Sequence, residues 1–367
     1  MSLSPRFHAL RVAEVRRETM EAVSILFDVP AALADAYQFR AGQYLTLRTT
    51  VDGTELRRSY SICAGPDDGE LRVAVKLVEG GVFSAWANTA LATGDMLDVM
   101  TPTGRFGQVS GGQVYACFAA GSGITPVLSI VRGLLSREPG ARVFLFYGNR
   151  STAGMLFRDA LEELKDRFMG RLSVFHVLSA EQQDVPVLNG RLDAAKVRLL
   201  LQHVVPAALI DHAFLCGPAP MLDELEPVLL SLCLAPEQIH VERFVSAHAG
   251  LPRRAAVVVD TAAAPFATAV LIADGRRFEV PVAAGEAVLD AALRAGLDLP
   301  YACKGGMCST CRARVLEGTV TMALNFSLEP WEVAAGFVLT CQAMPGGGRV
   351  VVALVGTTSR SAPSARA

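Results

Sequence analysis

The chain has 367 residues, 51% of them hydrophobic, and a formal net charge of −2. This length suits two or three domains, and the composition excludes a disordered chain. A charge so close to zero excludes a general attraction to nucleic acid or anionic membranes. No signal-peptide pattern and no apolar run long enough to span a bilayer is present, so we expect a cytoplasmic protein without membrane insertion.

Short alternating segments with turn signals between them fill residues 1–110 and predict an antiparallel β-barrel or sandwich. In "LRRSYSIC", Arg58 and Tyr60 share one face of a strand. Arg58 can hold a phosphate, and Tyr60 can cover an aromatic ring. The alternative is an ordinary strand with a surface charge, which would have the same sequence pattern. The segment "EGGVFSAW" strengthens the first interpretation, because its glycines can open a helix that faces a pyrophosphate.

Apolar strands alternate with helical segments over residues 111–246, which predicts a parallel sheet covered on both faces. "AAGSGITP" ends the first of these strands, where open α/β sheets bind ligands. Gly121 and Gly123 allow close backbone approach, and Thr125 offers a hydroxyl. Because Pro126 replaces the third glycine of the dinucleotide fingerprint, a plain strand-to-helix turn stays open.

Later strand ends carry further candidates for a nicotinamide cofactor. Arg150 and Ser151 follow the second strand, where a carboxylate would favour NADH and an arginine favours the 2′-phosphate of NADPH. A solvated surface arginine is the alternative. Cys216 can touch a nicotinamide ring or be a buried structural cysteine, and Phe244 can cover a flavin or fill the core.

Residues 247–265 lack a clear period and are predicted to be a linker. Residues 266–357 form a predicted third domain, which opens with a β-hairpin at Asp274-Gly275 and a short helix. Residues 358–367 are predicted to be a disordered tail.

Four cysteines of this third domain have the spacing of a metal centre. Cys303, Cys308 and Cys311 follow the pattern C-x4-C-x2-C, and Cys341 is the distant fourth member. This is the spacing of plant-type [2Fe-2S] sites. A structural zinc site usually has two C-x2-C pairs, whereas only one is present here. Disulfides are disfavoured without a secretion signal.

These motifs, in this order, resemble the ferredoxin–NADP reductase superfamily followed by a plant-type ferredoxin. The resemblance rests on five motifs: R-S-Y-S, G-G-V-F-S, G-S-G-I-T-P, C-G-P-A-P-M and the cysteine loop. The fused order is that of reductase components of bacterial oxygenases. "YGNRS", "HVERF" and "AAGFVLTCQAMP" are similar to the reductases of ring-1,2-phenylacetyl-CoA epoxidases. The resemblance covers roughly residues 6–355 and implies a multidomain fold: a β-barrel FAD domain, an α/β parallel-sheet nucleotide domain and an α+β (β-grasp) ferredoxin domain.

The resemblance implies an electron-transfer reductase that uses NADPH, FAD and a [2Fe-2S] cluster to supply an oxygenase. The first expectation for the partner is the multi-subunit diiron epoxidase of phenylacetate degradation. The alternatives are another oxygenase, either a Rieske dioxygenase or 3-ketosteroid 9α-hydroxylase, and a non-redox zinc-binding module. A membrane-associated carrier is disfavoured because no basic amphipathic segment is present.

The resemblance also implies roles for individual residues. Catalytic positions are Ser61, Cys216 and Phe244. The expected FAD contacts are Arg58, Ser59, Tyr60, Ser61, Lys76, Gly81, Val82, Phe83 and Ser84. The expected nicotinamide-cofactor contacts are Gly121, Gly123, Thr125, Pro126, Arg150, Ser151, Cys216 and Gly217. The expected cluster ligands are Cys303, Cys308, Cys311 and Cys341.

Overall fold

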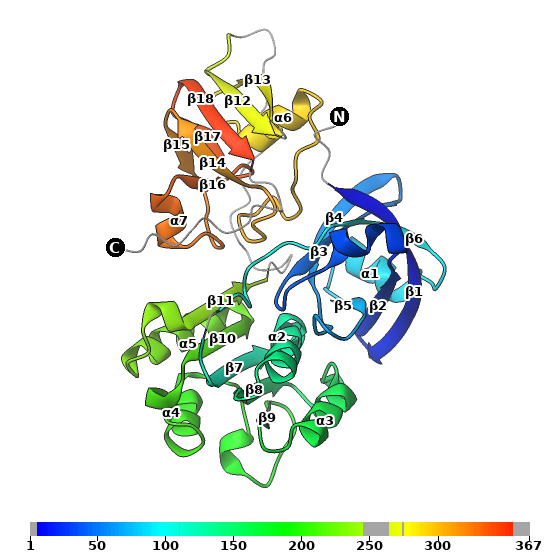
Figure 1. Cartoon of the computed structure of the whole chain (residues 1–367), viewed down its shortest axis with the longest axis vertical. Helices are drawn as coiled ribbons and strands as arrows, with labels where there is room; N and C mark the ends of the chain where they lie inside the picture. Colours follow the sequence, from blue (N-terminus) through cyan, green and yellow to red (C-terminus); the bar gives the residue numbers. More distant parts are fainter. Residues whose placement is uncertain (1–5, 110, 245–263, 274, 355–367) are drawn as a thin grey trace. The chain divides into compact units, whose positions relative to one another are not determined.

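The computed structural model describes residues 6–109, 111–244, 264–273 and 275–354 (Figure 1). Most of the predicted linker and all of the predicted tail lie outside these ranges. The described chain divides into two compact units, one mainly of residues 9–244 and the other mainly of residues 264–354. Within the described ranges, no helix combines the length and apolarity needed to cross a membrane.

The larger unit begins with a six-stranded antiparallel sheet in the order β4-β3-β6-β1-β2-β5. Its elements are β1 (Phe7–Thr19), β2 (Ala22–Asp28), β3 (Tyr44–Val51), β4 (Thr54–Ser61), β5 (Leu71–Lys76), α1 (Val82–Thr89) and β6 (Met96–Met100). A bridge between Ile62 and Val73 joins the end of β4 to β5, so the curled sheet closes at that end. Alternate strand residues, among them Leu10, Ile25 and Leu47, fill its interior. The predicted antiparallel FAD-domain fold is confirmed.

A five-stranded parallel sheet, in the order β11-β10-β7-β8-β9, completes the larger unit. Its elements are β7 (Val114–Ala120), α2 (Ile124–Arg137), β8 (Arg142–Asn149), α3 (Arg158–Arg167), β9 (Leu172–Leu178), α4 (Ala194–His203), β10 (His212–Gly217), α5 (Ala219–Ser231) and β11 (Ile239–Arg243). Helices α2 and α3 pack in one core, and α4 and α5 pack in another. The middle strands are apolar throughout because both faces are covered. The predicted α/β domain is confirmed.

The smaller unit contains a five-stranded mixed sheet in the order β13-β12-β18-β14-β16. Its elements are β12 (Ala267–Ala273), β13 (Arg276–Val282), α6 (Val288–Arg294), β14 (Arg312–Glu317), β15 (Val320–Met322), α7 (Pro330–Ala334), β16 (Phe337–Leu339), β17 (Ala343–Pro345) and β18 (Gly348–Leu354). The neighbours β12 and β18 run parallel. The other three pairs are antiparallel: β13 with β12, β14 with β18, and β16 with β14. Helix α6 contributes to the core beneath this sheet. The predicted α+β ferredoxin-like domain is confirmed.

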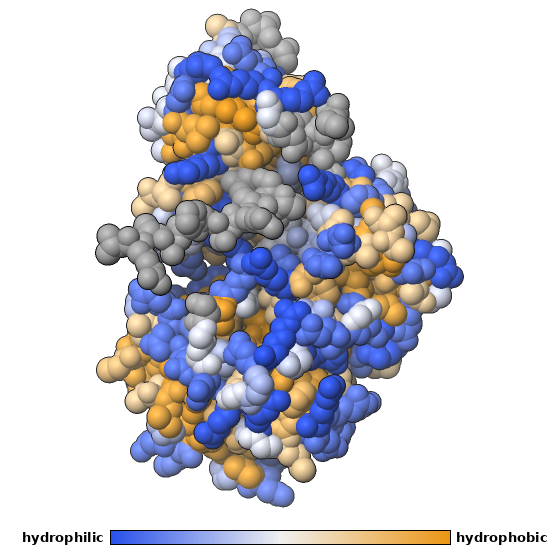
Figure 2. Space-filling model, viewed as in Figure 1, coloured by the Kyte–Doolittle hydropathy of each residue, from blue (hydrophilic) through white to orange (hydrophobic). Residues whose placement is uncertain are grey.

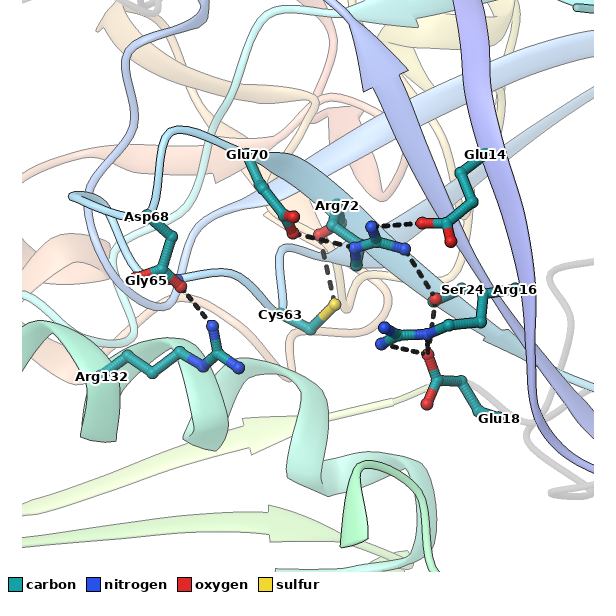
Figure 3. Close-up of polar contacts among 10 residues, drawn as sticks. All are labelled: Glu14, Arg16, Glu18, Ser24, Cys63, Gly65, Asp68, Glu70, Arg72 and Arg132. Carbon is teal, nitrogen blue, oxygen red and sulfur yellow. Dashed lines mark hydrogen bonds and ion pairs between the residues drawn. The ribbon is translucent and has the colours of Figure 1, made fainter. Parts of the chain in front are cut away.

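A buried arginine holds three strands of the first sheet together (Figure 3). Arg72 on β5 is only 6% exposed, and its guanidinium lies 2.6 Å from a carboxylate oxygen of Glu14 on β1 and 3.0 Å from one of Glu70. It also donates to Ser24 Oγ on β2, at 3.1 Å. The two carboxylates and the hydroxyl supply the partners that a buried guanidinium needs. The hydrogen bond from Arg72 lowers the pKa of Glu14.

Helix α2 fastens the first sheet to the second within the larger unit. Ser129 Oγ, which is fully buried, donates to the carbonyl of Ala64 at 2.7 Å. One turn further along, Arg132 pairs with Asp68 (Figure 3). These contacts fix the loop that follows Ser61, and therefore fix the end of β4 against the nucleotide domain. On the visible face of this unit, hydrophilic and hydrophobic residues are interspersed as on an ordinary solvated surface (Figure 2).

Candidate functional site

The predicted flavin contacts lie at the end of β4 and the start of α1. Arg58 is exposed, Ser59 and Tyr60 are half-buried and Ser61 is buried. The Tyr60 ring lies 5.4 Å from that of Phe83, centroid to centroid. Phe83 is only 1% exposed, and it also packs edge-on against Trp86. Phe83 therefore supports the ring of Tyr60 from the core side, and Tyr60 presents the accessible aromatic surface.

The turn before α1 is built around Gly81 and Ser84. Ser84 Oγ donates to the carbonyl of Gly81 at 2.9 Å and accepts a hydrogen bond from the backbone N–H of Val78. A Cβ atom at Gly81 would stand 2.6 Å from Ser84 Oγ, so a side chain at this position would disrupt the turn. The first backbone N–H groups of α1, beginning at Val82, have no partner within the helix and suit an anionic group. Lys76 is the last residue of β5, and its Nζ lies 3.7 Å from Oε2 of Glu21.

The turn between β7 and α2 packs directly on β10. A Cβ atom at Gly123 would lie 2.1 Å from the carbonyl oxygen of Cys216, and one at Gly217 would lie 2.6 Å from Met221. At Gly123 only glycine allows the two backbones to approach so closely, whereas at Gly217 the close neighbour is the end of the Met221 side chain. Thr125 is buried and donates to the carbonyl of Ser122, so its hydroxyl fixes the turn.

This turn lies at a topological switch point of the sheet. The chain runs from β7 outward to β8 and β9 on one side, while β10 and β11 lie on the other side. Ligands of open α/β sheets bind at this crevice. Gly121 adopts a φ of +54° there, and Pro126 is buried in the first turn of α2.

Ser61 and Glu242 meet where the barrel faces this crevice. The Ser61 hydroxyl donates to Oε2 of Glu242 at 3.4 Å, and Glu242 on β11 is the register partner of Cys216 on β10. Burial raises the pKa of Glu242 to about 8, although the hydrogen bond from Ser61 opposes this shift. Burial, and then the nearby Glu242 charge, raise the pKa of Cys216, so Cys216 stays a thiol. The structure therefore brings Ser61 to the carboxyl group of Glu242, which lies on the strand next to Cys216.

Sequence reasoning missed Glu242, although it stands in the motif "HVERF". A glutamate on a short strand is usually solvent-facing, and only the pairing of β11 with β10 reveals its position. Phe244 follows the strand and is half-buried against the core that α2 also joins. Among the described contacts, Phe244 shows no direct interaction with Ser61.

Arg150 lines an open pocket of about 440 Å³ beyond the ends of β8 and β9. The other lining residues are Ser179, Ala180, Gly190 and Arg191. Neither guanidinium has an ion-pair partner within the described ranges. The nearby carboxylate of Glu181 is occupied, because it accepts hydrogen bonds from the backbone N–H and the hydroxyl of Thr152. Ser151 is half-buried and directly precedes the short 3₁₀ helix Thr152–Gly154. Arg191 is a second cation that the sequence motifs did not reveal.

The four predicted cluster cysteines are grouped as two contacting pairs. Cys303 is hydrogen-bonded to Cys308, and Cys311 to Cys341. The charge interactions of Cys303 with Cys341, and of Cys308 with Cys311, link the two pairs. In the part of the chain that the structure describes, no three His, Cys, Asp or Glu side chains form a set suited to a metal ion. Two pairs fit a cluster of two irons, each with two thiolates.

The backbone of the cysteine loop is shaped around the sulfur atoms. Lys304, Gly306 and Ser309 have φ values of +50°, +78° and +52°, so the loop turns tightly. The N–H of Gly305 donates to Sγ of Cys303 at 3.3 Å. The hydrogen bond from Cys308, together with those from backbone N–H groups, lowers the pKa of Cys303, although burial opposes this shift. This favours the thiolate, which is the form that binds iron. These cysteines fit a [2Fe-2S] cluster.

Family models match all three parts of the chain. An oxidoreductase FAD-binding domain matches residues 10–107, and an oxidoreductase NAD-binding domain matches residues 118–226. A 2Fe-2S iron-sulfur cluster binding domain matches residues 271–346.

Solved structures share the whole three-domain fold. Phthalate dioxygenase reductase aligns with a TM-score of 0.56 at 22% identity, covering 95% of this chain and 98% of its own. An intact type IV self-sufficient cytochrome P450 monooxygenase aligns with a TM-score of 0.68 at 22% identity, covering 94% of this chain and 41% of its own. At these identities the likeness concerns the fold alone.

Curated relatives match the chain almost from end to end. A subunit of 1,2-phenylacetyl-CoA epoxidase from Escherichia coli (strain K12) is 46% identical, over 94% of this chain and 97% of its own length. The ferredoxin reductase component of 3-ketosteroid-9-alpha-monooxygenase from Rhodococcus rhodochrous is 34% identical, over 92% of this chain and 93% of its own length. The chain is therefore an NAD(P)H-dependent oxidoreductase with FAD and [2Fe-2S] domains, and it belongs to the family of electron-transfer reductases that includes these two oxygenase components.

Proposed function

We propose that this protein is the reductase component that supplies electrons from NADPH to a multi-subunit diiron epoxidase acting on phenylacetyl-CoA. The near full-length identity of 46% to one component of a phenylacetyl-CoA epoxidase carries the choice of partner. The 34% identity to a ketosteroid monooxygenase reductase makes that oxygenase the second candidate. We also propose the domain limits predicted from the sequence, 1–110, 111–246 and 266–357, which enclose the three family matches.

The proposed division of labour follows from the residues at each site. FAD accepts two electrons as a hydride and a [2Fe-2S] cluster passes one at a time, so the pair converts a two-electron donor into a one-electron supply. The protein's task is to bind and orient. In this proposal Arg58 and the start of α1 hold the diphosphate, and Tyr60 covers the flavin ring. Cys303, Cys308, Cys311 and Cys341 hold the cluster.

Ser61 and Cys216 would position the reacting edges of the flavin and the nicotinamide. Their contact with Glu242 supports this role, because it brings the flavin-side and nucleotide-side residues to one point. With its pKa raised to about 8, Glu242 is mostly protonated near neutral pH. A neutral carboxyl group can exchange hydrogen bonds with Ser61 without placing a negative charge beside an electron-accepting ring.

NADPH is proposed as the donor because two arginines line the pocket beyond β8 and β9, and neither has an ion-pair partner among the described residues. In this proposal, a dinucleotide whose nicotinamide lies at the β7–β10 switch point extends across the sheet toward β8 and β9. Its adenosine end then reaches the pocket of Arg150 and Arg191. A ribose 2′-phosphate carries about two negative charges, which these guanidiniums can bind through charge-assisted hydrogen bonds.

Replacing Arg150 or Arg191 tests the choice of donor. Arg150→Asp, and separately Arg191→Gln, should raise the KM for NADPH about tenfold or more while changing the KM for NADH much less, because only NADPH loses a charged contact. Ferricyanide reduction by the holoprotein measures both constants. Arg198→Gln, which changes an exposed arginine on α4, is the control for general charge and should leave both values near wild type. Equal increases for both donors would contradict the assignment.

Replacing Glu242 tests its protonation. A carboxyl whose folded pKa is raised holds its proton up to about pH 8, so its effect is complete at low pH and is lost as the pH rises through 8. The rate of NADPH-dependent ferricyanide reduction should therefore fall around pH 8 in wild type, and this step should be absent in Glu242→Gln. The control Glu163→Gln, on the exposed face of α3, should keep the wild-type profile. A step retained in Glu242→Gln would show that another group titrates.

Reconstitution tests the partner directly. The purified oxygenase subunits of a phenylacetyl-CoA epoxidase, mixed with this protein and NADPH, should form the epoxide at a rate that saturates with reductase concentration. A ketosteroid monooxygenase oxygenase supplied in the same way should show far lower turnover. The reverse preference would overturn the proposed partner while leaving the reductase activity itself intact.

A further inference from the structure

Gln342 directly follows Cys341, the fourth of the proposed cluster cysteines. Its side chain is only 1% exposed. Its Nε2 group donates to the carbonyl of Lys304 at 2.8 Å and lies 3.6 Å from Sγ of Cys341. Lys304 directly follows Cys303 and is 38 residues away from Gln342 in the chain. One amide group therefore joins the segments that carry the first and last cysteines of the site.

The surroundings of Gln342 leave its side chain little freedom. Its backbone N–H donates to the carbonyl of Leu339, and its own carbonyl accepts from the N–H of Ala323. Gly306, with a φ of +78°, packs so closely that a Cβ atom there would lie 3.4 Å from Cγ of Gln342. The fixed backbone and this close neighbour hold the amide in one place.

Chemistry also fixes which end of the amide faces the cysteine. Both neighbours at this end, the Lys304 carbonyl and the Cys341 sulfur, are acceptors, so the NH₂ group must point toward them. The other end, Oε1, is buried and has no hydrogen-bond partner within the described ranges. Burying an amide with an unsatisfied oxygen is costly. The stabilising contribution of this side chain is therefore expected to come from the hydrogen bonds that its NH₂ group donates.

We propose that Gln342 is a positioning residue that makes the cluster easier to reduce. Reduction adds negative charge to the cluster, and an N–H group aimed at a ligand sulfur stabilises that charge, strongly so in a buried site. By holding the Lys304 carbonyl, the same amide would also fix the loop that follows Cys303. This inference depends on the bound cluster and not on the identity of the oxygenase.

The test is the midpoint potential of the cluster in Gln342→Met, measured on the holoprotein by redox titration monitored by EPR. Methionine keeps the length and approximate volume but has no N–H donor. We expect a more negative potential, with iron and sulfide contents equal to wild type. The control is Thr340→Val, which removes a buried hydroxyl bonded to the carbonyl of Cys311 and leaves the sulfur contact in place. An unchanged potential in Gln342→Met, or an equal decrease in Thr340→Val, would overturn the proposal.

A measurement on the wild-type protein keeps the proposal testable if Gln342→Met fails to assemble its cluster. Protein labelled with ¹⁵N in the glutamine side-chain amide should show ¹⁵N coupling in pulsed EPR spectra of the reduced cluster. The matched control is Gln238→Met, because Gln238 donates to carbonyls of the nucleotide domain and its loss should leave that coupling unchanged. Absence of the coupling in wild type would overturn the proposed contact.

Discussion

The contact between Ser61 and Glu242 is the physical constraint on which the proposed hydride-transfer site depends. It requires the end of β4 and the end of β11 to meet, although they belong to different sheets and lie far apart in the chain. The bridge from Ile62 to Val73 fixes the strand end, and Ser129 of α2 holds the loop that follows. The buried Arg72, with its carboxylate partners, in turn keeps β5 in place (Figure 3).

On the nucleotide-domain side of this contact, the backbones of the β7–α2 turn and of the end of β10 pack closely against each other. Gly123 brings the β7–α2 turn and the end of β10 to a distance that any larger residue would prevent, because a Cβ atom there would meet the backbone of Cys216. The crevice at the switch point is thus closely packed on the side where Cys216 and Glu242 lie. A closely packed site suits hydride transfer, because the reacting atoms must be held in a narrow range of distance and orientation.

The cluster domain is a separate compact unit with its own core. Its cysteine loop is stabilised within this unit by backbone N–H groups and by the side-chain amide of Gln342. A unit that holds its metal site independently can serve as the one-electron half of the reductase. The two-electron chemistry of the nicotinamide then stays in the larger unit.

Much of this could be predicted from the sequence, because the signals were local. The C-x4-C-x2-C spacing, the glycine turns and the change from alternating strands to strand–helix units each depend on neighbouring residues. Glu242, Arg191 and Gln342 could not be predicted, because each acquires its role from a segment distant in the chain. Phe83 was predicted as a flavin contact, and its packing behind Tyr60 depends on a core that no single motif describes.

The most direct test of the account is the order in which electrons pass through the protein. Cytochrome c and ferricyanide reduction with NADPH would be compared between the purified wild type and Cys308→Ser. The account predicts that Cys308→Ser loses cytochrome c reduction and retains ferricyanide reduction, because the cluster lies downstream of the flavin. If Cys308→Ser reduced cytochrome c as fast as wild type, electrons would leave from the flavin, which would contradict the proposed role of the cluster domain.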